Sequence, residues 1–118
     1  MLATPDVARW WVNSQLAMFD AGGWLSKGPA GMEYIPVMVA EHEIPLIVAT
    51  YQAGIRGFDV DKAYAACRKM QTTLPQKHSS GGFVGNENLE PYLKHGFVPY
   101  GEKSKLGHSQ EKWLTSNT

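Results

Sequence analysis

The chain has 118 residues, enough for one domain or for part of a larger one. Its 11 Lys and Arg residues balance its 11 Asp and Glu residues, so it lacks the excess positive charge that binding to nucleic acid or to an anionic membrane needs. The single cysteine, Cys67, excludes an internal disulfide framework, and no apolar run reaches the roughly 20 residues of a membrane-spanning helix.

The first predicted helix spans residues 5–20. Thr4 can cap the free amide groups at its start, Pro5 suits the first helical position, and Asp6 is favourable at the positive end of the helix. Apolar residues then recur at helical spacing until the glycine pair at 22–23 ends the pattern.

Three further helices are predicted downstream. The second runs from about residue 40 to 53, with one apolar face made of Ile44, Ile47, Val48 and Tyr51. Asp59 is expected to cap the third helix, whose apolar stripe includes Cys67. That position favours a small core residue over a catalytic thiol. A short fourth helix covers about residues 88–95.

Two long loops, residues 24–39 and 72–86, separate these helices. The predicted fold class is therefore all-α, with connections longer than small helical bundles usually have. Long apolar loops at one end of a helix stack build a site or pack against a neighbour.

The first loop and the start of the second helix hold the residues best suited to chemistry. They are Trp24, Glu33, Tyr34, Glu41 and His42. A carboxylic acid beside aromatic rings in a partly dry loop has a raised pKa and can act as a general acid, and an indole face can stack on a sugar ring. Glycoside hydrolysis needs two carboxyl groups, and Glu33 is one candidate for the acid, although a surface glutamate near a tryptophan is also common.

No metal ligand set is predicted from this pattern. Adjacent residues on a helix diverge by about 100°, so Glu41 and His42 are poorly placed to hold one ion. The alternative interpretation is a polar first turn, where acidic residues suit the helix N-terminus.

Three segments, in this order, resemble consecutive segments of one family. Residues 17–25 are similar to its Gly-Gly-Trp-Leu-Pro segment, and residues 51–64 are similar to its Gly-Ile-Arg-Gly-Phe-Asp segment. Residues 89–99 are similar to its Leu-Glu-Tyr-Tyr segment, which ends in Gly-Tyr-Ile-Pro. Over about residues 5–100 the chain thus resembles glycoside hydrolase family 92, the calcium-dependent exo-acting α-mannosidases.

The resemblance implies a fold and an activity. Residues 1–100 would be helical hairpins of an (α/α)6 barrel that is incomplete in this chain, and residues 101–118 a polar tail without likeness to the family. The family hydrolyses terminal α-linked mannose with inversion: a Glu protonates the leaving oxygen, an Asp activates water, and calcium holds and distorts the mannose.

The resemblance also assigns roles to residues. It places the general acid at Glu33, in the loop after the Gly-Gly-Trp segment, whereas counting back from Met38 places Tyr34 at that position. Trp24 and Tyr34 would help to form the sugar pocket. The family's next segment at the start of the second helix would correspond to Glu41 and His42.

Beyond Pro99 the sequence shows no likeness to the family segments that carry further sugar and calcium contacts or the catalytic base. The expectation is therefore part of an α-mannosidase acting on a mannose-containing glycan, inactive and without calcium unless the remaining part of the catalytic domain is supplied. Family habit implies a secreted or periplasmic protein, although the first residues show no secretory signal.

Two other interpretations remain open. One is a small non-catalytic helical module that binds carbohydrate or protein through Trp10, Trp11 and Trp24, which as large aromatic residues suit a buried or shared surface. The other is a decayed copy of the family domain that has no function.

Overall fold

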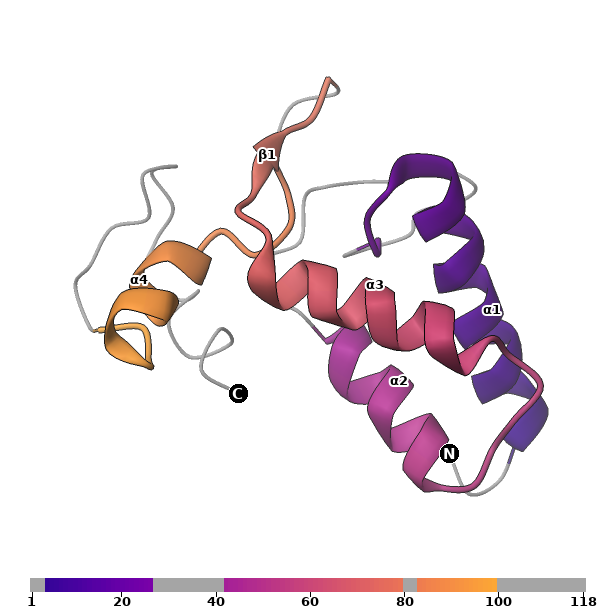
Figure 1. The fold of residues 1–118 in the computed structure, drawn as a ribbon. Helices are drawn as coiled ribbons and strands as arrows, with labels where there is room; N and C mark the ends of the chain where they lie inside the picture. Colours follow the sequence, from indigo (N-terminus) through magenta and orange to yellow (C-terminus); the bar gives the residue numbers. More distant parts are fainter. Residues whose placement is uncertain (1–3, 27–41, 80–82, 100–118) are drawn as a thin grey trace.

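The computed structural model of the chain describes residues 4–26, 42–79 and 83–99. These residues contain four helices and two short strands (Figure 1). The elements are α1 (Pro5–Gly22), α2 (Glu43–Gln52), α3 (Val60–Thr72), β1 (Gln76–Lys77), β2 (Phe83–Val84) and α4 (Leu89–His95). Each helix lies close to its predicted position. Among the described residues, no helix is both long and apolar enough to cross a membrane.

The helix ends follow local sequence signals. α1 ends at Gly23, whose φ of 78° is the left-handed conformation, and its amide donates to the Phe19 carbonyl over 2.7 Å. The Asp59 carboxylate accepts a hydrogen bond of 3.0 Å from the Lys62 amide, which confirms the predicted cap of α3. Thr4 precedes α1 as predicted, but within the described residues its side chain caps no amide group.

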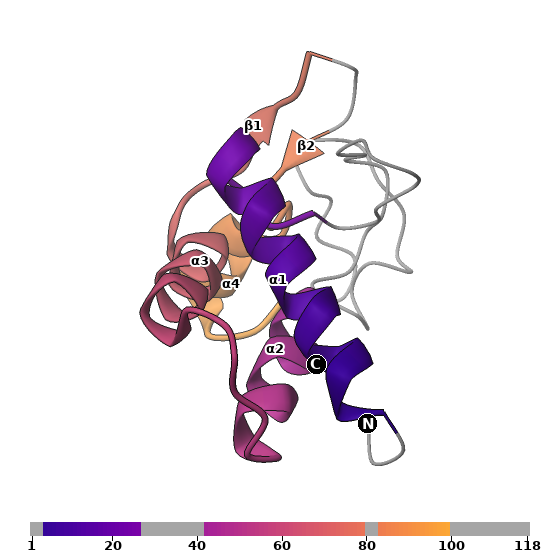
Figure 2. The same cartoon turned by 90° about the vertical axis from the view of Figure 1, so that its right-hand side faces the viewer.

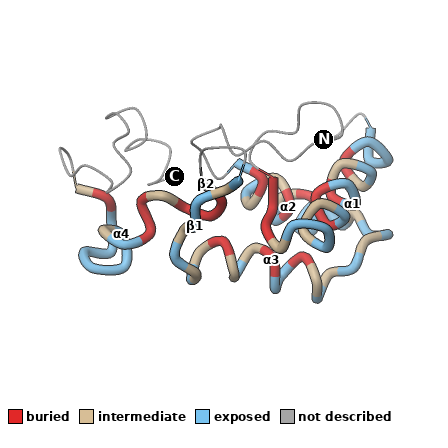
Figure 3. The backbone as a smooth tube through the Cα atoms, turned by 90° about the horizontal axis from the view of Figure 1, so that it is seen from above, coloured by how far each residue is buried: buried red, intermediate tan, exposed pale blue. Residues whose placement is uncertain are grey.

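The three longer helices share one core. α1 packs against both α2 and α3 (Figure 2). The core contains residues from all three helices, from the turn after α1 and from β2: Val12, Leu16, Trp24, Leu25, Ile47, Ala63, Ala66, Met70 and Val84. Figure 3 shows the buried residues concentrated between these helices, and again between the hairpin and α4.

The predicted apolar face of α2 is only partly buried. Ile47 is buried and Ile44 packs partly against the core, whereas Val48 and Tyr51 are exposed. The buried face instead includes the polar residues Glu43 and Thr50. The helix is therefore turned so that part of its apolar surface faces away from α1.

The predicted loop over residues 72–86 contains a short hairpin. β1 and β2 pair antiparallel, with Gln76 opposite Val84 and Lys77 opposite Phe83. The described chain is thus mostly helical, in line with the all-α prediction, with this hairpin as a correction to it. An (α/α)6 barrel is not formed by the described residues.

Candidate functional site

The segment that leaves α1, residues 23–26, is packed into the core. Trp24, Leu25 and Ser26 are 6%, 0% and 1% exposed. The loop that contains the candidate acid follows directly from Ser26. The position of this segment therefore determines where that loop begins.

Side chains of two helices hold this segment. From α1, the Gln15 side-chain oxygen accepts a hydrogen bond of 3.0 Å from the buried Ser26 amide. From α3, the Lys69 ammonium donates to the Gly23 carbonyl and lies 4.3 Å from the centroid of the Trp24 ring. A buried amide without an acceptor would be costly, so the Gln15 contact both stabilises and orients the backbone.

Trp24 also contacts the hairpin region. A methyl group added at Gly85 would lie 2.9 Å from Cζ3 of the Trp24 ring and 3.2 Å from the Pro75 Cα atom. The indole is thus packed against the backbone of the hairpin on one side and against Lys69 on another. In the described part of the chain Trp24 is a core residue, and its contact with a sugar stays a prediction.

The other predicted site residues are only partly covered by the structure. Glu33, Tyr34 and Glu41 lie outside the described residues. His42 is exposed and directly precedes α2, and its carbonyl accepts a hydrogen bond of 3.2 Å from the Leu46 amide. Predicted contacts of these four residues with substrate therefore stay predictions.

Sequence reasoning missed a buried carboxyl group at Glu43. The residue is 3% exposed, at the first position of α2. Burial, and after it the nearby charge of Glu43, raise the pKa of the Cys67 thiol from 9.0 to about 11. The spacing of the sequence could have indicated that Glu43 is buried, because Glu43, Ile47 and Thr50 lie at i, i+4 and i+7 on one helix face. A thiol with so high a pKa stays protonated near neutral pH, which is unfavourable for a catalytic nucleophile.

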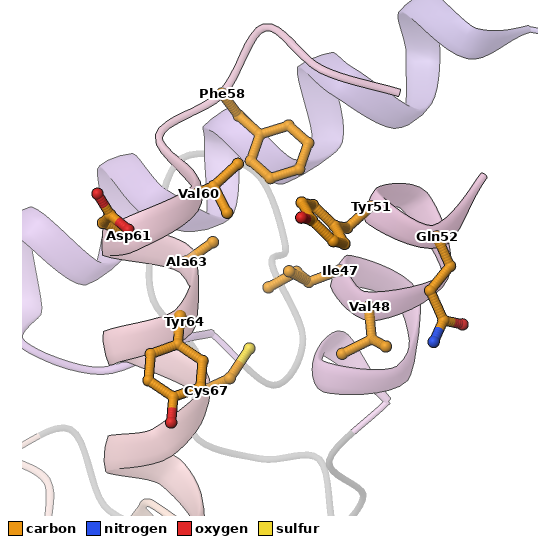
Figure 4. A pocket seen from close by; sticks show the side chains of 10 residues that line it. All are labelled: Ile47, Val48, Tyr51, Gln52, Phe58, Val60, Asp61, Ala63, Tyr64 and Cys67. Atoms are coloured by element: carbon orange, nitrogen blue, oxygen red, sulfur yellow. The ribbon is translucent and has the colours of Figure 1, made fainter. Parts of the chain in front are cut away.

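A groove of about 400 Å³ lies between α2 and α3. Figure 4 shows Ile47 and Tyr51 of α2 facing Phe58, Val60 and Ala63 on the α3 side, with Cys67 lower on α3. The lining is mostly apolar, and Gln52 and Asp61 add polar groups to it. In residues 4–26, 42–79 and 83–99 no three His, Cys, Asp or Glu side chains gather to hold a metal ion.

Comparison with known families gives a match over nearly the whole chain. The sequence profile of the "Glycosyl hydrolase family 92 catalytic domain" matches residues 1–116. The match continues past residue 100, where the family-like part was predicted to end. The division of the chain into residues 1–100 and a polar tail stays a prediction. No curated protein matches the chain. Because the match covers nearly the whole length, the chain belongs to glycosyl hydrolase family 92, and its 118 residues hold a part of that catalytic domain.

Proposed function

We propose that this chain supplies the general-acid part of an inverting α-mannosidase, which removes terminal α-linked mannose from a glycan. The observation that supports this most is the match of residues 1–116 to a glycoside hydrolase catalytic domain. Membership of that family indicates a glycan substrate, and we propose that the sugar removed is mannose.

In this proposal Glu33 protonates the leaving oxygen of the glycosidic bond. A general acid must lie within hydrogen-bond reach of that oxygen, so the loop that carries it needs a defined starting point. The buried segment 23–26, held by Gln15 and Lys69, supplies such a point directly before the loop. Trp24, Tyr34, Glu41 and His42 are proposed to form the mannose pocket around the acid.

The base and calcium belong, in this proposal, to the rest of the catalytic domain. Among the described residues, no three His, Cys, Asp or Glu side chains gather to hold a metal ion. The chain alone should hydrolyse no mannoside and bind no calcium, and a secreted or periplasmic location is part of the same proposal.

The test is a hybrid enzyme in which this chain replaces the corresponding segment of an active α-mannosidase of the family. The hybrid should release mannose from an α-mannobioside, and the first product seen by proton NMR should be the β-anomer. The Glu33→Gln variant should lose about 10²-fold or more of this activity, because the leaving sugar needs a proton.

A substrate with a better leaving group gives the control. Dinitrophenolate leaves without protonation, so Glu33→Gln should reduce hydrolysis of 2,4-dinitrophenyl α-mannoside by less than about tenfold. Tyr34→Phe, which keeps the ring and all carboxyl groups, should change the hydrolysis of the two substrates by similar factors. An equal loss on both substrates in Glu33→Gln, or the leaving-group effect in Tyr34→Phe instead, would refute Glu33 as the acid.

A second candidate function is the non-catalytic binding module. Trp10 is 65% exposed and Tyr64 beside the groove is 67% exposed, which favours a shared surface. Trp11 packs partly against the core and Trp24 is buried, so Trp10 is the best placed of the three tryptophans. Calorimetric binding of methyl α-mannoside to the chain alone, lost in Trp10→Ala but kept in Glu33→Gln, would favour this function.

A further inference from the structure

Lys69 lies in the last turn of α3 with its ammonium group directed at the end of α1. The group donates a hydrogen bond to the Gly23 carbonyl. It lies 4.3 Å from the centroid of the Trp24 ring and 5.8 Å from that of the Phe19 ring. One cation on α3 therefore lies near Phe19 in the last turn of α1 and near Gly23 and Trp24 in the segment that follows that helix.

These contacts depart from the usual behaviour of a surface lysine, which extends its stem along the protein and keeps its ammonium group in water. Gly23 is the C-terminal cap of α1, where carbonyl groups lack helical partners and the helix dipole is negative. An indole face is the strongest aromatic partner for a cation. The contact with the ring needs the positive charge, the hydrogen bond is strengthened by it, and both favour the same location of the ammonium group.

The same short segment is held at its other end from α1. The Gln15 side-chain oxygen accepts a hydrogen bond of 3.0 Å from the Ser26 amide. Ser26 lies two residues after Trp24, whose ring Lys69 contacts. Two helices thus define the position of the backbone at Gly23 and at Ser26. Beyond Ser26 the chain continues into the loop that contains Glu33.

We propose that Lys69 is a positioning residue of the glycosidase site, because its charge holds segment 23–26 and thereby the start of the loop that carries the acid. The role of the loop rests on the proposed function, whereas the effect of Lys69 on Ser26 does not. Lys69 touches no reacting atom in this scheme and acts through the backbone alone.

The experiment is amide hydrogen exchange by NMR on the complete 118-residue chain. Lys69→Met keeps an apolar stem and removes the charge. It should speed exchange of the Ser26 amide at least about tenfold, while the core amides of Val12 and Met70 change less than about threefold. Lys69→Arg, which keeps a cation and donors, should return the Ser26 rate to within about threefold of the parent.

Lys62→Met is the matched control. It removes a lysine from the same helix, one whose ammonium lies 2.8 Å from Asp20 on α1, but which is not among the contacts of segment 23–26 described above. Its Ser26 exchange should stay at the parent rate. If Lys69→Met does not fold, Lys69→Gln removes the charge with one donor retained and must meet the same criterion.

Three outcomes would overturn the proposal: an unchanged Ser26 rate in the charge-removing variant, an equal rise at Ser26, Val12 and Met70, or no recovery with Lys69→Arg. In the hybrid enzyme, Lys69→Met should lower kcat for the mannobioside more than for the dinitrophenyl mannoside, and Lys62→Met should change neither. An inactive parent hybrid would count against the proposed function, while the exchange rates would still decide whether Lys69 positions Ser26.

Discussion

Gly85→Ala tests the packing of Trp24 against the hairpin. Gly85 has a φ of +85°, a conformation that side chains with a Cβ atom rarely adopt. The added methyl group would also lie 2.9 Å from Cζ3 and 3.3 Å from Cη2 of the Trp24 ring, both shorter than an ordinary contact. The substitution therefore combines backbone strain with a clash inside the core.

Gly54→Ala separates these two costs. Gly54 has nearly the same φ, +82°, but among the described residues no atom lies within 4 Å of the added methyl group. The left-handed conformation costs an alanine about 1–2 kcal/mol, partly offset by about 0.4–1 kcal/mol from the lower entropy of the unfolded chain. We expect a loss of about 1 kcal/mol for Gly54→Ala. Overpacking adds about 1–3 kcal/mol in Gly85→Ala, for a total of about 2–4 kcal/mol.

The assay is urea unfolding followed by far-ultraviolet circular dichroism, with the free energy of unfolding compared at unchanged m-value. A thermal melt should show the same order, with a shift of roughly 3–6 °C for each kcal/mol in a chain of this size. Trp24→Phe, which shortens the ring system, should reduce the extra cost of Gly85→Ala in a double-mutant cycle. Equal losses in the two glycine variants would show that Trp24 does not pack on Gly85, and would refute this account of the core.

Other substitutions probe single contacts. Ser26→Ala should raise the free energy of unfolding by up to about 1 kcal/mol in urea titrations, because the buried Ser26 hydroxyl has no hydrogen-bond partner among the described residues; a clear loss would contradict this. Asp59→Ala should cost about 1 kcal/mol and Asp59→Asn much less, as measured by thermal melts, since only the alanine removes the cap. Burial and Glu43 raise the pKa of Cys67 to about 11, so at about pH 8 the folded chain has about a hundredfold less thiolate than the unfolded chain. Alkylation of Cys67 should therefore be slow in the folded chain, and Glu43→Gln should speed it. A raised pKa stabilises the fold below the unfolded value of 9.0, so the stability advantage of the parent over Cys67→Ala should fall as the pH rises from about 9 to about 11; a flat difference would argue against the shift.

The boundaries of the helices could be read from the sequence because the signals that set them are local. The glycine pair after α1, the Asp59 cap of α3 and Gly96 after α4 each act within a few residues of the chain. The family likeness was also available from short segments in order, and the match over residues 1–116 confirms it.

The face with which each helix packs against its neighbours could not be predicted from such local signals. The sequence placed Tyr51 on the apolar face of α2, yet the residue is exposed beside the groove, while the carboxyl group of Glu43 is buried. The exposure of Tyr51 and the burial of Glu43 both depend on which side of α2 packs against α1. Helical periodicity predicts an apolar face but does not predict which element packs against that face.

The candidate site shows the same division. Composition identified Trp24 as a residue with a role, but only tertiary packing placed it in the core, between the ammonium of Lys69 and the backbone of Gly85. Those partners come from α3 and from a hairpin that local propensity did not predict, more than 40 residues along the chain. The sequence by itself determined the helices and the family, because caps and periods are local. The packing of Trp24, the hold of Lys69 on segment 23–26 and the burial of Glu43 were decided by contacts between distant segments, which exist only once the chain has folded.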